Sequence, residues 1–120
     1  MLDDAGQHER AATLFRKAAA GKIVLVSGPP VLFEIAWTLR SAYGLPRDRV
    51  LDVLARIAGM RGLRLTDSAI VEAALAVAGE SGQEFADAYV VASAREASAT
   101  AVATFNMKHF ERMRFPLHPL

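Results

Sequence analysis

Short apolar runs alternate along the chain with longer stretches in which apolar residues recur every three or four positions. The runs are typical of buried strands, and the longer stretches are typical of amphipathic helices. Strands are predicted at residues 23–27, 63–66 and 100–105. Helices are predicted between Asp4 and Gly21 and over 30–43, 45–58, 67–78 and 84–97, with a loop over 79–82, a turn or short helix over 106–110 and an irregular tail over 115–117.

The order of these elements predicts the class of fold. Strands and helices alternate, and the strands are apolar throughout, which favours a parallel sheet with helices on both faces, an α/β sandwich of three layers. A chain of 120 residues without a linker or an internal repeat fits one domain, residues 1–120. In such sheets the chemistry is found at the C-terminal ends of the strands, where the following loops open.

Composition and charge narrow the classes of function. The chain has no cysteine, which excludes a disulfide scaffold and a thiolate metal site. Its net charge of +1 gives no global basic field for nucleic acid. No apolar stretch approaches the roughly 20 residues of a membrane span, and the N-terminus lacks the pattern of a signal peptide, so we expect a cytoplasmic protein. Five basic residues are candidates for a local patch: Arg61, Arg64, Lys108, Arg112 and Arg114.

Two acidic residues stand apart from those on solvated helix faces. Asp87 shares its helix face with Val90, Val91 and Ala94, and a carboxylate in that row is costly to bury unless it is paired or bound to a cation. Glu34 lies among apolar residues in an early turn of its helix, just after the strand at 23–27. Both acids are therefore expected near helix N-termini at the active edge of the sheet, where the helix dipole favours negative charge.

A third polar point follows the last clear strand. Thr104 and Asn106 can offer a hydroxyl and an amide oxygen at its end. Two carboxylates with oxygen donors, and without cysteine, suit Mg²⁺ or Mn²⁺ better than Zn²⁺. Such a site can activate water and neutralise charge on a phosphoryl group.

Structural interpretations of the same residues remain open at this stage. Asp87 can be satisfied by backbone amides or by Arg95, and Glu34 can pair with Arg40 or cap its own helix. Asn106 can be a turn residue, because asparagine tolerates the left-handed conformation. The three histidines, His8, His109 and His118, are interpreted as surface residues, and Trp37 and the phenylalanines as core.

Three blocks of the sequence resemble one family. Residues 23–45, with Glu34, resemble the second strand and glutamate helix of PIN-domain proteins, in particular VapC-type toxins. Residues 85–94, with Asp87, resemble their aspartate helix, and residues 102–110 resemble their fourth strand and the Thr-x-Asn/Asp turn that follows it. The blocks occur in the family order and cover nearly the whole chain.

The resemblance implies a function. It implies a Mg²⁺-dependent (or Mn²⁺-dependent) endoribonuclease toxin of a type II toxin–antitoxin system, which cleaves RNA, tRNA included, by metal-activated water. Glu34 and Asp87 would be the metal ligands, and Asn106 and Thr104 would order water or phosphate. The implied partners are a cognate antitoxin and a second copy of the chain.

The chain also departs from the family pattern. Relatives begin with a central apolar strand that ends in an acidic metal ligand, whereas residues 2–11 resemble the segment after that strand, so Asp3 and Asp4 are given no metal role. The absence of this strand would leave two strand edges unpaired, so we expect either that the chain lacks its true beginning or that it is a shortened domain that repairs its sheet another way. Asn106 stands where many relatives have aspartate, and His109 where others have a further acid. The alternative functions are a catalytically impaired PIN remnant that binds an antitoxin or dimerises, and a generic α/β domain with structural carboxylates.

Overall fold

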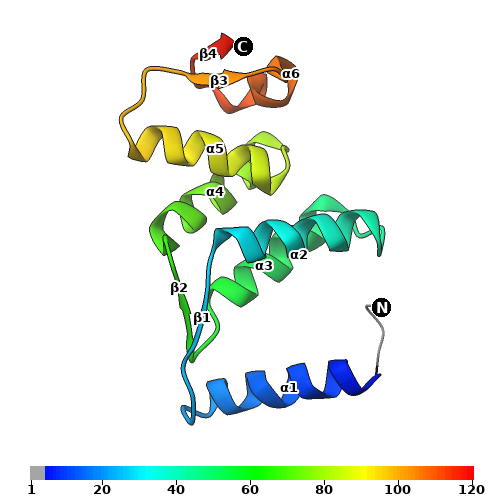
Figure 1. Cartoon of the computed structure of the whole chain (residues 1–120). Coiled ribbons are helices and arrows are strands. Elements are labelled where there is room, and N and C mark those ends of the chain that lie inside the picture. The colour runs from blue at the N-terminus through cyan, green and yellow to red at the C-terminus, as the bar shows by residue number, and fades with distance from the viewer. Residues whose placement is uncertain (1–4) are drawn as a thin grey trace.

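The computed structural model describes residues 5–120 as helices joined by short parallel strands (Figure 1). The order in the chain is α1 (Ala5–Ala19), β1 (Leu25–Ser27), α2 (Pro29–Ser41), α3 (Arg47–Ala58), β2 (Leu63–Leu65), α4 (Ser68–Ser81), α5 (Phe85–Glu96), β3 (Val102–Thr104), α6 (Met107–Phe110), the 3-10 helix η1 (Glu111–Met113) and β4 (Leu117–Pro119). The predicted α/β class is confirmed. None of the helices in this range is both long and apolar enough to cross a membrane.

The helix boundaries follow the chemistry of the chain. α2 begins with two prolines after Gly28. Proline is well tolerated in the first turn of a helix, because the backbone N–H groups of that turn have no partner within the helix and the missing N–H of proline is not needed there. The loop predicted over 79–82 is wrong, because α4 continues through Gly79 to Ser81 and ends at Gly82, whose φ is +74°. A single glycine inside a helix costs only about 1 kcal/mol, and burial of Val77 and Ala78 on the same turn outweighs it.

The strands form two separate parallel pairs within residues 5–120. β1 pairs with β2, with Leu25 opposite Leu63, and β3 pairs with β4, with Val102 opposite Leu117. The tail predicted as irregular over 115–117 is confirmed at Phe115 and Pro116 and is wrong at Leu117, where β4 begins. Backbone hydrogen bonds join the C-terminal segment to β3. The Val102 N–H donates to the Pro116 carbonyl at 2.9 Å, and the Leu120 N–H donates to the Thr104 carbonyl at 3.1 Å.

Two apolar clusters hold the fold together. One lies among α2, α3, α4 and α5 and includes the fully buried Leu32, Leu54 and Val71. The other joins α4 and α5 to the C-terminal segment through Val91, Phe110 and Met113. Both clusters use α4 and α5, so these two helices position everything that follows β3.

Several apolar residues predicted in the core lie on the surface. Trp37 is 71% exposed on α2 and Phe105 is 80% exposed just after β3. The prediction that the strand at 23–27 is buried is wrong at Val24 and Val26, which are exposed. Only some of the phenylalanines, including Phe85 and Phe110, are buried as predicted.

Gly62 allows α1 to pack against the start of β2. Its φ is +84°, and a Cβ atom there would collide with the carbonyl oxygen of the fully buried Ala18. We expect Gly62→Ala to lower the free energy of unfolding by about 1–3 kcal/mol, measured by urea denaturation. Gly21→Ala is the matched control, because Gly21 has a similar φ of +78° but a Cβ there meets nothing within 4 Å. Equal losses in the two variants would contradict the steric explanation.

Candidate active site

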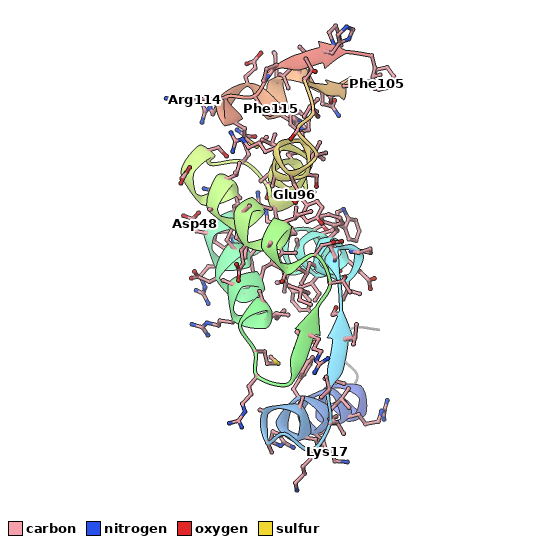
Figure 2. The ribbon with its side chains drawn as sticks, turned by 90° about the vertical axis from the view of Figure 1, so that its left-hand side faces the viewer. Lys17, Asp48, Glu96, Phe105, Arg114 and Phe115 are labelled. Carbon is pink, nitrogen blue, oxygen red and sulfur yellow. The ribbon has the colours of Figure 1, made fainter. Side chains whose placement is uncertain are left out.

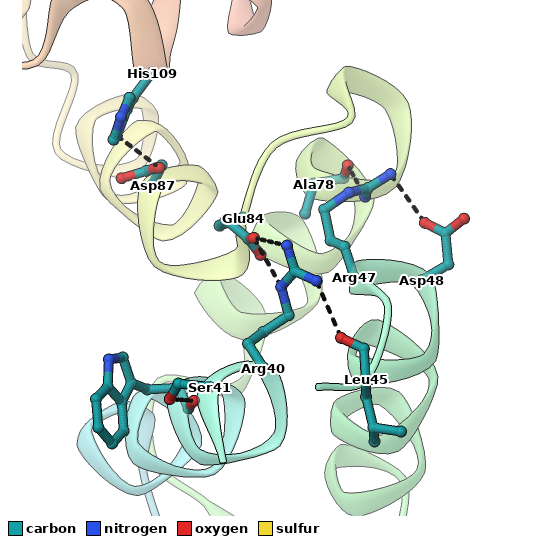
Figure 3. Close-up of polar contacts among 10 residues, drawn as sticks. Arg40, Ser41, Leu45, Arg47, Asp48, Ala78, Glu84, Asp87 and His109 are labelled. Atoms are coloured by element: carbon teal, nitrogen blue, oxygen red, sulfur yellow. Dashed lines mark hydrogen bonds and ion pairs between the residues drawn. The ribbon is translucent and has the colours of Figure 1, made fainter. Parts of the chain in front are cut away.

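Asp87 connects α5 to the segment after β3. It lies in the first turn of α5, where the helix dipole favours a negative charge. Its Oδ2 atom is 3.5 Å from Nδ1 of His109 on α6 (Figure 3). The Asp87 side chain is 25% exposed and that of His109 59%, so the pair stands at the surface with the carboxylate on its inner side.

The surroundings shift the pKa of the Asp87 carboxyl upward. Burial is the largest cause, since it removes water from the charged form, and the nearby charge of Glu84 adds to the effect. His109 acts in the opposite direction and lowers this pKa. Perturbed carboxyl groups of this kind are common at functional sites.

The turn after β3 holds Thr104, Asn106 and His109 in one chain of hydrogen bonds. The buried Thr104 accepts a hydrogen bond at Oγ1 from the Asn106 backbone N–H at 3.0 Å. The Asn106 carbonyl accepts one from the His109 backbone N–H, also at 3.0 Å. The turn contacts Asp87 through the His109 side chain, so α5 and the C-terminal end of β3 are joined at this point. The Asn106 side chain forms no hydrogen bond within residues 5–120 and is free to contact a ligand.

Glu34 lies apart from this turn, on the exposed surface of α2. It forms no hydrogen bond or ion pair with any residue that the structure describes. The interpretation that Arg40 pairs with Glu34 is wrong, because Arg40 binds Glu84, with Nη2 2.7 Å and Nε 2.9 Å from Oε1 (Figure 3). Arg95 does not satisfy Asp87 either, since it donates to the Met113 carbonyl.

The packing of α2 on α5 sets the relation between Glu34 and Asp87. The Phe33 ring lies 5.6 Å from that of Phe85 and 5.2 Å from that of Tyr89, measured between ring centroids. Asp87 is two residues from each of these rings, which places it about 160° around α5 from them. α5 therefore presents its aromatic side to α2 and its carboxylate to α6, and the convergence of Glu34 with Asp87 stays a prediction.

Comparison with family models decides the identity of the fold. The model of the PIN domain matches residues 1–116. The chain belongs to the PIN domain family. PIN domains are typically nucleases that use divalent metal ions, which assigns this chain to the nucleases and indicates a nucleic acid as its substrate. No curated protein and no solved structure matches the sequence.

The donor atoms at this PIN site suit a hard divalent cation. Asp87 offers a carboxylate in contact with the turn that carries Asn106, and Mg²⁺ in proteins is commonly held by one or two carboxylates together with water. Within residues 5–120 no group of three or more His, Cys, Asp or Glu side chains could hold a metal ion. Asp87 is therefore the predicted metal ligand that lies at this turn, and the role of Glu34 as a second ligand stays a prediction.

His109 is a surface residue, as predicted, but its contact with the Asp87 carboxylate was not predicted from the sequence. The signal available in the sequence was its place three residues after Asn106, on the short helix α6 that follows the turn.

We expect His109→Ala to raise the pKa of the Asp87 carboxyl. A protonated imidazole favours the carboxylate, so its removal leaves the raising effects of burial and Glu84 unopposed. Carbon-13 NMR titration of the Asp87 carboxyl measures the shift. His118→Ala is the control, because His118 is exposed and its one side-chain hydrogen bond within residues 5–120 is to the neighbouring Pro119 carbonyl. An unchanged titration midpoint in the His109 variant would show that the imidazole does not act on Asp87.

Proposed function

We propose that this PIN domain is a Mg²⁺-dependent endoribonuclease of the VapC kind, the toxin of a type II toxin–antitoxin system. The observation that carries the proposal is the partly buried Asp87 carboxylate at the end of β3, next to the turn formed by Thr104 and Asn106. The resemblance of the three sequence blocks to VapC-type toxins supports the choice of RNA as the nucleic acid.

Each residue of the proposed site has a distinct task. Asp87 and Glu34 would hold Mg²⁺ or Mn²⁺, which supplies an activated water and neutralises charge on the phosphodiester. Asn106 orients water or a phosphate oxygen with its free amide, and Thr104 fixes the turn that carries Asn106. His109 holds the Asp87 carboxylate in place and stabilises its charged form when the imidazole is protonated.

The proposal includes partners and a compartment. The substrate is RNA, with structured tRNA as the first molecule to try, and the site of action is the cytoplasm. A cognate antitoxin and a second copy of the chain are the proposed protein partners. Exposed apolar side chains on α2, such as Trp37 and Val31, support such contacts because they offer surface that a partner can cover.

Cleavage of RNA in defined metal ions tests this function. We expect the purified chain to cleave a tRNA pool with Mg²⁺ or Mn²⁺, and to stop when EDTA removes the cation, because the charge on the phosphodiester is then not neutralised. Ca²⁺ at the same concentration serves as a control for general charge screening. Cleavage that continues in EDTA would contradict the proposal.

A groove on α2 favours a second candidate function, a PIN remnant without catalysis that binds an antitoxin or dimerises. The groove has a volume of about 220 Å³ and is lined by Phe33, Trp37, Val50 and Phe85, among others. Calorimetry with Mn²⁺ separates the two candidates. Absence of Mn²⁺ binding together with a stable dimer favours the remnant, and binding that Asp87→Ala abolishes favours the nuclease.

A further inference from the structure

We propose that Arg95, Arg112 and Arg114 form a second site on this chain, which binds the phosphate backbone of single-stranded RNA away from the reacting carboxylate. This inference rests on the proposed function, since it adds a place for the substrate of that reaction. We call the site the arginine notch. It lies between the ends of α4 and α5 and the 3-10 helix η1.

The notch is a hollow of about 330 Å³ in which positive charge predominates. The three arginines line it together with Ser81 and one acid, Glu80. Figure 2 shows Arg114 beside Phe115 at the C-terminal end of the molecule, where its side chain projects from the chain. Three positive charges against one negative charge favour an anion.

One arginine of the notch is held in place. Arg95 donates a hydrogen bond from Nη2 to the Met113 carbonyl at 3.1 Å, and its Cζ atom lies 6.0 Å from the centroid of the Phe115 ring. Both contacts come from the segment that begins in η1, across the notch from α5. They fix the guanidinium before a ligand arrives, which reduces the entropy lost on binding.

The other two arginines are available to a ligand. Arg112 and Arg114 form no hydrogen bond or ion pair with any residue among 5–120. Arg114 adopts a left-handed backbone with φ of +53°, directly after η1. This conformation turns the chain so that Arg112 and Arg114 line the same hollow. A guanidinium binds a phosphate through two parallel hydrogen bonds, which suits two unpaired arginines to a phosphodiester chain.

The composition of the notch favours RNA over a protein partner. Its apolar lining residues, Val77 and Met113, are themselves buried and leave little apolar surface to cover. Protein interfaces rely on an apolar centre, whereas binding of a polyphosphate gains from the release of counterions. Asp87 and Arg95 lie eight residues apart on α5, about 12 Å along the helix axis, so one oligonucleotide can reach both.

The notch also corrects the basic patch expected from the sequence. Of the five residues of that patch, Arg112 and Arg114 line the notch, and the third arginine is Arg95. Arg61 and Arg64 belong to the segment around β2, in the other half of the molecule from α6 and β4 (Figure 1). The structure therefore brings only Arg112 and Arg114 of the expected patch into this hollow, with Arg95 as the third arginine.

Fluorescence anisotropy with a labelled single-stranded RNA tests the notch. The titration is done in EDTA, so that cleavage does not interfere. We expect the double variant Arg112→Gln/Arg114→Gln to bind at least about 10-fold more weakly, with the slope of log K against log salt reduced by about 1.4, which is 0.7 for each lost contact. The double variant Arg49→Gln/Arg56→Gln removes two exposed arginines from α3 and should bind within about 2-fold of the parent chain.

Three results would overturn the inference, and normal RNA binding by the notch variant is the most direct of them. Equal losses in both double variants would show that only net charge matters, and displacement of the RNA by polyglutamate as readily as by polyuridylate would identify a protein-docking surface. Circular dichroism melting of each variant confirms that it is folded. The nuclease assignment is judged separately, by metal-dependent cleavage of RNA. Normal RNA binding by the notch variant together with intact cleavage rejects the notch alone. RNA binding that depends on the notch, without any cleavage, rejects the nuclease alone.

Discussion

Replacing Asp87 by asparagine should reduce RNA cleavage about 100-fold or more and, at the same time, make the folded chain more stable at pH 7. The loss of activity is expected because asparagine keeps the shape of the side chain but removes the negative charge that attracts a divalent cation. Changes to residues that merely support a metal ligand already cost about 10- to 100-fold. Removal of a ligand charge is expected to cost at least as much.

The gain in stability follows from the pKa of the same carboxyl. Burial raises this pKa in the folded chain above its ordinary value of 3.8. The protonated form is therefore favoured by folding, and this contribution to stability is present at acidic pH and is lost as the pH rises through the folded pKa. At pH 7 the ionised carboxylate opposes folding, and the neutral amide does not. The difference in free energy of unfolding between the variant and the parent should shrink as the pH falls below 4.

A matched variant makes the Asp87 test specific. Asp52 is exposed on α3, so Asp52→Asn removes the same charge without touching the site. Urea denaturation at pH 7 and pH 3.5, together with initial rates of RNA cleavage, gives both readouts. Cleavage by the Asp87 variant at the rate of the Asp52 variant would remove Asp87 from the mechanism. A loss of stability at pH 7 would show that the contact with His109 outweighs the cost of burial.

Local patterns were sufficient to predict the helices and three of the strands. The spacing of apolar residues placed α2, α3 and α5 within a few residues of their observed ends. Local patterns could not predict β4, because Leu117–Pro119 has no strand-forming pattern of its own and is a strand only through its pairing with β3. They also could not predict that the strands form two separate pairs, since strand partners depend on contacts between distant segments.

The candidate site was predictable residue by residue but not as an arrangement. Asp87 stood out as an acid on an apolar helix face, and Thr104 and Asn106 as polar residues at a strand end. The contact between Asp87 and His109 joins two helices, and no spacing within either helix contains that information. The exposure of Trp37 and Phe105 was missed for the same reason, because burial depends on which elements cover a residue.

The second large effect is expected from Phe85→Ala, which should lower the free energy of unfolding by about 3–5 kcal/mol. Phe85 is only 2% exposed, and its ring contacts those of Phe33 and Tyr89 with centroids 5.6 and 6.0 Å away. Truncation of the Phe85 ring leaves a cavity where α5 meets α2, and the surrounding helices can move to fill this cavity only in part. Because domains of this size are stable by about 5–15 kcal/mol, much of the variant should unfold in moderate urea.

Phe105→Ala is the control that separates burial from the chemistry of the residue. Phe105 is 80% exposed, so the same truncation should change the free energy of unfolding by no more than about 0.5 kcal/mol. Urea denaturation of both variants, followed by circular dichroism, measures the difference. Phe85 also begins the helix that carries Asp87 two residues later, so loosening it should weaken cleavage even in the folded fraction. Equal stabilities of the two variants would mean that α5 does not depend on this aromatic cluster and that Asp87 is positioned by its contacts with α6 alone.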